Sequence, residues 1–154
     1  MKKILILVLA IMLFTGVYAQ AGQLGLGLTK GADIDDIGLY VGYQFGLAPK
    51  INLGPDMTYY LTSSGLTYFE INFNLFYSFV ADGNLSVYGL AGLQFAYASI
   101  DLGFLGSSSN SEIGINLGLG IQINLGGASL FLEPKFTING FEQLAFSGGV
   151  RFKL

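Results

Sequence analysis

The sequence predicts an all-β protein, an eight-stranded antiparallel transmembrane β-barrel preceded by a cleaved signal peptide. Two observations predict the barrel. Apolar residues alternate with small or polar residues along most of the chain, which is the period of a strand. Charged residues make up only 11% of the composition and hydrophobic residues 52%, so much of the surface is expected to face something other than water.

Residues 1–19 have the pattern of a secretory signal peptide. Lys2 and Lys3 precede an apolar run, Ile4–Phe14, that is shorter than the roughly 20 residues of a transmembrane helix. We expect cleavage after Ala19, with Ala21 as the alternative site, and a barrel domain over residues 20–154. A retained anchor is the competing interpretation. The sequence contains no Cys, which excludes a lipoprotein anchor.

The alternation is clearest between Ile113 and Leu125, where every second residue is aliphatic and the residues between are Gly, Asn or Gln. Successive side chains of a strand point to opposite faces, so one face of this segment is wholly aliphatic. The same pattern predicts seven further strands, at about 24–28, 37–45, 51–61, 69–79, 85–97, 130–138 and 144–154.

The connections between these segments alternate in length. Short turns are predicted at 46–49, 81–84 and 126–127, longer polar loops at 30–36 and 99–111, and intermediate ones at 62–65 and 139–143. The short turns are every second connection, so we expect them at one end of the barrel together with both termini, and the loops at the other end.

The aliphatic face carries no Asp, Glu, Lys or Arg in any predicted strand. Such a face suits lipid, where a Lys or Arg near the midplane costs about 2–4 kcal/mol. Aromatic residues on this face gather toward both ends of the strands, as at the two interfaces of a membrane. A soluble barrel that binds an apolar ligand inside is the alternative, but it requires a charged exterior that this sequence lacks.

With these features the chain resembles the small eight-stranded outer-membrane barrels of the OmpA/OmpX type. It is similar in the same way to the outer membrane protein β-barrel domain family. The resemblance spans about Gln23–Leu154 and is most specific in the last strand. There Phe146, Val150, Phe152 and Leu154 resemble the insertion signal that the barrel assembly machinery recognises, although many such proteins end in Phe. The resemblance implies the outer membrane of a Gram-negative bacterium, with lipids and lipopolysaccharide as neighbours.

The predicted inner face carries a group of charged residues. An eight-stranded barrel is just wide enough for side chains to fill its interior, and a buried charge is costly unless it is paired. We therefore expect an ion-pair network inside the barrel; its members are Glu70, Glu133, Lys135 and Arg151. The alternative is a gated ion path lined by the same residues, but bulky Tyr and Phe residues on this face favour a filled interior.

The composition also limits the chemistry. The chain has no His and no Cys, so the usual bases and nucleophiles of hydrolases are missing, and we expect no enzyme, cofactor or typical zinc site. Without Lys2 and Lys3, 5 basic residues remain against 10 acidic ones, which argues against nucleic acid. Asp33, Asp35 and Asp36 form an acidic loop that we interpret as a solvated rim; a Ca²⁺ or Mg²⁺ bridge to lipopolysaccharide phosphates is the alternative.

The sequence therefore favours a non-enzymatic barrel with a structural or surface-binding, adhesin-like role, in which extracellular loops contact a surface ligand. A narrow pore for water, ions or very small solutes is the alternative function.

Overall fold

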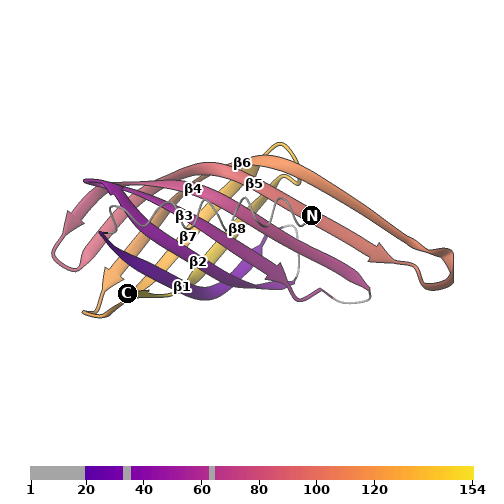
Figure 1. Cartoon of the computed structure of the whole chain (residues 1–154), viewed down its shortest axis with the longest axis horizontal. Coiled ribbons are helices and arrows are strands. Elements are labelled where there is room, and N and C mark those ends of the chain that lie inside the picture. The colour runs from indigo at the N-terminus through magenta and orange to yellow at the C-terminus, as the bar shows by residue number, and fades with distance from the viewer. Residues whose placement is uncertain (1–19, 33–35, 63–64) are drawn as a thin grey trace.

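The strands close on themselves into a barrel (Figure 1). The structure, a computed structural model, describes residues 20–32, 36–62 and 65–154; the expected signal peptide lies outside them. Each strand pairs antiparallel with the next, and β1 pairs with β8, which confirms the predicted fold class. The elements are β1 (Gln20–Gly31), β2 (Ile37–Ala48), β3 (Ile51–Tyr60), β4 (Leu66–Asp82), β5 (Leu85–Asp101), η1 (Gly103–Leu105), β6 (Ser107–Asn124), β7 (Ala128–Ile138) and β8 (Gln143–Lys153).

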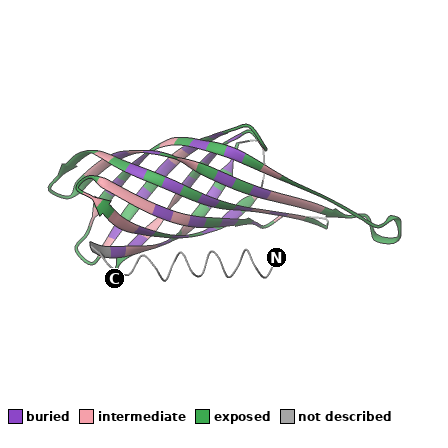
Figure 2. Ribbon diagram, turned by 45° about the horizontal axis from the view of Figure 1, so that its top comes forward, coloured by how far each residue is buried: buried purple, intermediate pink, exposed green. Residues whose placement is uncertain are grey.

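Exposed and buried residues alternate along the middle of the strands, as the banding of the ribbon in Figure 2 shows. On β4, Phe73 and Leu75 are 36% and 42% exposed, whereas Asn72 and Asn74 between them are buried. The barrel is thus apolar outside and polar inside, the reverse of a soluble barrel. Closure pairs both edges of the sheet, which is required where lipid offers no hydrogen-bond partner.

The connections fall at two ends. The short turns after β2, β4 and β6 each contain a residue with positive φ, namely Lys50 (66°), Gly83 (55°) and Gly126 (99°). The longer connections, together with the tip of the β5–β6 hairpin, lie at the opposite end. In the described segments, no helix is long and apolar enough to cross a membrane.

The prediction of a loop over residues 99–111 is wrong in its length. β5 continues to Asp101 and β6 starts at Ser107, with these two residues paired, so the connection is only 102–106. Small polar residues such as Ser107, Ser108 and Ser109 are typical of loops, which is why the sequence predicts a loop here. A hairpin that projects into water needs backbone pairing but no buried side, so its sequence does not have to alternate.

Candidate functional site

The buried charged residues among those described are Asp56, Glu70, Glu133, Lys135 and Arg151. All of them lie on the inner faces of strands, and they divide into three layers along the barrel. The outer layer, toward the longer connections, contains Glu70 and Lys135. The middle layer contains Asp56, and the inner layer, toward the short turns, contains Glu133 and Arg151.

The outer layer is built around Glu70, which is fully buried on β4. Lys135 Nζ lies 3.8 Å from Glu70 Oε2. The Tyr68 hydroxyl donates a 2.9 Å hydrogen bond to Glu70 Oε1, and the Gln143 amide donates to the same oxygen. Two hydrogen-bond donors from β4 and β8 on Oε1, and one cation from β7 near Oε2, therefore compensate one buried carboxylate, as burial of a charge requires.

The middle layer is a hydrogen-bonded cluster of amides on one carboxylate. Asp56 accepts hydrogen bonds from the side-chain nitrogens of Asn72 (2.7 Å) and Asn74 (2.8 Å). Asn116 donates to the oxygens of the same two amides, at 2.8 and 3.0 Å, and accepts from the Thr137 hydroxyl at 2.9 Å. This cluster joins β3, β4, β6 and β7 across the middle of the barrel.

The sequence places these amides on the inner face but does not identify the cluster. Asp56 and Asn116 are polar residues at ordinary inner-face positions, and the alternation says nothing about which of them meet. Asp56 meets amides of the next strand, β4, whereas Asn116 on β6 reaches the same two amides across β5. Both sets of contacts depend on strand register. The one Asn-x-Asn spacing, at Asn72 and Asn74, is a local signal for two members of the cluster.

The inner layer is an ion pair between Arg151 and Glu133. The Arg151 guanidinium also donates to the Tyr88 hydroxyl at 2.7 Å and to Gln122 Oε1 at 3.0 Å, and the Tyr88 hydroxyl donates to Glu133 Oε2 at 2.6 Å. The four expected interior charges thus form two separate pairs, Glu70 with Lys135 and Glu133 with Arg151, with the amide cluster between them.

Aromatic rings surround the Arg151 guanidinium. Its central carbon lies 4.1 Å from the centroid of the Phe131 ring, 5.5 Å from that of Tyr88 and 5.9 Å from that of Phe76. Tyr40 packs on Phe131 with 5.4 Å between centroids. The cation is held by ring faces as well as by its carboxylate, and these large side chains fill the barrel at this level.

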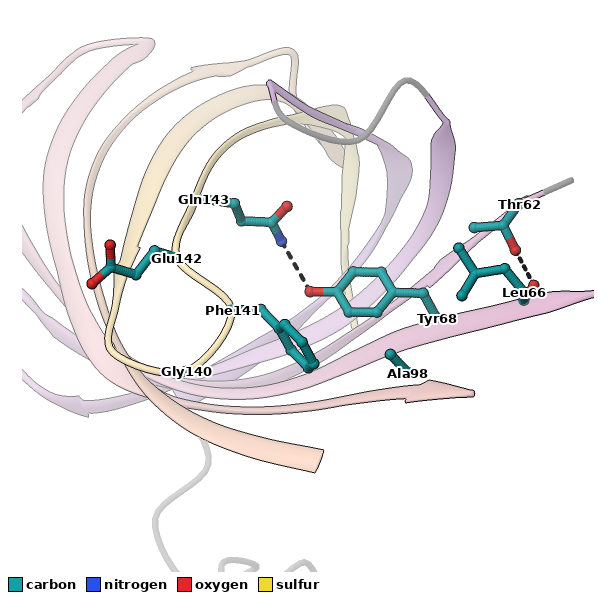
Figure 3. Close-up of a pocket in the computed structure, with 8 residues that line it drawn as sticks. All are labelled: Thr62, Leu66, Tyr68, Ala98, Gly140, Phe141, Glu142 and Gln143. Atoms are coloured by element: carbon teal, nitrogen blue, oxygen red, sulfur yellow. Dashed lines mark hydrogen bonds between the residues drawn. The ribbon is translucent and has the colours of Figure 1, made fainter. Parts of the chain in front are cut away.

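Hollows lie at the two ends of the barrel. One of about 160 Å³ at the short-turn end has a mainly polar lining that includes Gln23, Gln44 and Gln122. The other, of about 420 Å³, lies at the end of the longer connections and is lined largely by apolar side chains (Figure 3). The amide cluster lies between the residues that line the two hollows.

The β5–β6 hairpin extends beyond the rest of the barrel (Figures 1 and 2). Its tip, residues 102–106, contains the single turn η1 and is closed by a hydrogen bond of 2.9 Å from the Leu102 amide to the Gly106 carbonyl. Asp101 accepts a 2.8 Å hydrogen bond from the Gly103 amide. Phe104 at the tip is 98% exposed and Leu105 is 72% exposed.

Comparison with solved structures decides the fold. The N-terminal β-barrel domain of Pseudomonas aeruginosa OprF superposes with a TM-score of 0.73 at 14% identity, covering 89% of this chain and 100% of that one. The fold is that of the small eight-stranded outer-membrane barrels. Neisserial surface protein A matches this barrel with a TM-score of 0.66 at 17% identity, over 87% of this chain and 95% of that one.

A third outer-membrane barrel of this fold is Ail, the attachment invasion locus protein of Yersinia pestis, in complex with the heparin analogue sucrose octasulfate. It matches with a TM-score of 0.62 at 15% identity, over 87% of this chain and 97% of that one. No protein-family model and no curated protein sequence matches the chain. Identities this low establish the shared fold, and function has to be argued from this chain's own residues.

The remaining predicted site residues lie apart from the interior of the barrel. Phe146 and Phe152 are 45% and 42% exposed on the outer face of β8, and Val150 lies on the same face. Asp36 is half-buried just before β2, whereas Asp33 and Asp35 lie outside the described residues. Within the described part of the chain, no three His, Cys, Asp or Glu side chains gather as a metal site would require.

Proposed function

We propose that the protein is a non-enzymatic barrel of the Gram-negative outer membrane that binds a partner at the cell surface through its β5–β6 hairpin. The observation that carries the proposal is the exposure of Phe104, 98%, at the tip of a hairpin that projects beyond the barrel. In this proposal the barrel is an anchor with a filled interior.

The hairpin tip is built to present Phe104. Gly103 and Gly106 have φ of 64° and 94°, conformations that glycine adopts without strain, and the Asp101 carboxylate holds the Gly103 amide. Leu102 and Leu105 add exposed apolar surface on the same turn. An exposed aromatic residue with aliphatic neighbours is the kind of group that anchors protein interfaces.

Charge limits the partner. Acidic side chains outnumber basic ones among the described residues at this end of the barrel, with Asp36, Asp101, Glu112 and Glu142 against Lys30. The structure of Ail contains a sulfated saccharide, but an acidic rim repels a polyanion. We therefore expect the partner of this chain to be neutral or basic where it meets the hairpin.

The outer face supports the proposed membrane placement and assembly. Across the middle of the strands the outer face is aliphatic, with aromatic residues toward its ends and the charge of Lys30 near the loop end of β1. This arrangement supports contact with outer-membrane lipids and lipopolysaccharide. Phe146, Val150 and Phe152 on the outer face of β8, with Leu154 directly after that strand, support recognition by the barrel assembly machinery.

The test uses liposomes that carry the refolded protein and beads coated with fibronectin, laminin, collagen or serum albumin. We expect attachment to at least one matrix protein, and its loss in a variant with Leu102→Ser, Phe104→Ser and Leu105→Ser. Ser107→Thr, at the start of β6, is the matched control and is expected to attach like the wild type. Attachment no greater than that of protein-free liposomes on every coating would contradict the proposal.

A further inference from the structure

The hollow of about 420 Å³ at the outer end of the barrel has the size of a small-molecule site. Its walls come from both sides of the barrel mouth. Thr62, Leu66, Tyr68 and Ala98 contribute one side, and residues 140–143 contribute the other (Figure 3).

The second wall exists because the chain reverses directly after β7. Asn139 and Gly140 have φ of 58° and 71°, and this turn brings Phe141 toward Tyr68 across the mouth. The two rings meet edge to face, with centroids 5.8 Å apart and planes at 87°. Tyr68 in turn packs on Tyr60, with 4.9 Å between centroids, so the aromatic wall rests on buried side chains.

The lining favours a flat apolar group. The rings of Tyr68 and Phe141 and the side chains of Leu66 and Ala98 form most of it. Aromatic walls that meet edge to face receive another ring in an offset or edge-on arrangement. None of the described lining residues is basic, and Glu142 is acidic, so the cavity does not suit an anion.

Gln143 supplies an unused hydrogen-bond acceptor. It lines the cavity and is only 3% exposed. Its amide nitrogen donates to Glu70 and, at 3.3 Å, to the Tyr68 hydroxyl. A carboxylate only accepts hydrogen bonds, so Glu70 fixes which end of the amide is the nitrogen. The other end, Oε1, has no hydrogen-bond partner among the described residues, and a buried unpaired acceptor is costly.

We propose that this cavity binds a small uncharged aromatic compound with one N–H or O–H donor. The ring lies against Tyr68 and Phe141. Oε1 of Gln143 has almost no exposed surface, so the donor binds it after a small shift of the Gln143 side chain opens this oxygen to the cavity. The cavity is separate from the hairpin tip, residues 102–106, so a test of this proposal does not depend on the surface-binding proposal.

Methyl NMR in lipid nanodiscs tests the site, with indole as the probe. The methyl groups of Ala98 and Leu66 report on the cavity, and those of Ala81 and Leu125 at the short-turn end serve as controls. We expect saturable shifts at Ala98 and Leu66 and none at the two controls. Absence of saturable shifts, or equal shifts at all four residues from partition into lipid, would overturn the proposal.

Benzothiophene has the shape of indole without the N–H group, so it tests the hydrogen bond with the protein unchanged. Loss of one neutral hydrogen bond should weaken binding about fivefold to tenfold. Equal affinity for the two compounds would refute the role of Gln143.

A pair of variants tests the location of the site. Ala98→Leu should fill the cavity and abolish the indole shift at Leu66, whereas Ala81→Leu, the same change at the other end of the barrel, should leave it unchanged. An unchanged response in Ala98→Leu would place the bound indole elsewhere and overturn the proposal.

Discussion

Arg151 and Glu133 form an ion pair inside the barrel although neither is the other's direct neighbour on the β7–β8 ladder. Arg151 stands opposite Ser129, and Glu133 stands opposite Ser147. The Arg151 side chain therefore runs along the barrel past Phe131, whose ring lies 4.1 Å from the guanidinium carbon. The pair depends on the register of two strands and on the ring between them.

Arg151→Ala should destabilise the folded barrel strongly. The change leaves Glu133 buried without its cation and removes the hydrogen bonds to Tyr88 and Gln122. Breaking a buried pair in this way typically costs about 3–5 kcal/mol. Urea unfolding in lipid vesicles measures the change, with Lys153→Ala, an exposed position on the same strand, as the control. Equal unfolding midpoints for the two variants would refute a structural role for the pair.

Asn116→Asp should destabilise the middle layer. A carboxylate at this position still accepts from Thr137 but has no proton to donate to Asn72 and Asn74. Two lost hydrogen bonds in the interior correspond to about 1–3 kcal/mol or more. The same unfolding measurement on Asn84→Asp, an exposed position in the turn after β4, provides the control. The amide cluster is unimportant if both variants unfold like the wild type.

The sequence predicts which side chains point out of the barrel and which point in, because successive residues of a strand point to opposite faces. This prediction needs no knowledge of which strands pair. Residues such as Leu119 and Asn116 are assigned to opposite faces by their odd and even positions alone, and the structure confirms this assignment. The contacts of Asp56 with Asn72 and Asn74, and the reach of Arg151 to Glu133, depend on register and on barrel width. The position of Phe141 depends on two positive φ angles at Asn139 and Gly140, which a side-chain pattern does not encode.

Leu119→Arg tests the outer face. Leu119 is 58% exposed near the middle of β6, and an Arg at the bilayer midplane should cost about 2–4 kcal/mol. Leu125→Arg, the same change beside the short turn after β6, should cost about 0–1 kcal/mol because it lies near the interface. Unfolding of the two variants in vesicles checks the difference. Similar costs at both positions would mean that Leu119 does not face the lipid core.

The filled interior predicts that the barrel is not a general porin. Liposomes carrying the protein should swell no faster in small sugars than protein-free liposomes, because three layers of paired side chains cross the barrel. Arg151→Ala should leave this rate unchanged, since the rings of Phe76, Tyr88 and Phe131 remain. Reproducible sugar flux through the wild type would favour the narrow-pore alternative instead.

The central claim is that the apolar face of each strand meets lipid and the polar face is inside. The chain has no Trp, so a single introduced Trp reports on one position. Phe73 and Phe76 lie on the same strand, Phe73 on the outer face at 36% exposure and Phe76 inside at 3%. Phe131→Trp provides a second inner position. In bilayers with brominated acyl chains, fluorescence of the Phe73→Trp variant should be strongly quenched, whereas that of Phe76→Trp and Phe131→Trp should be little affected. Strong quenching at the two inner positions with none at Phe73 would show that the barrel is inverted or not embedded as described.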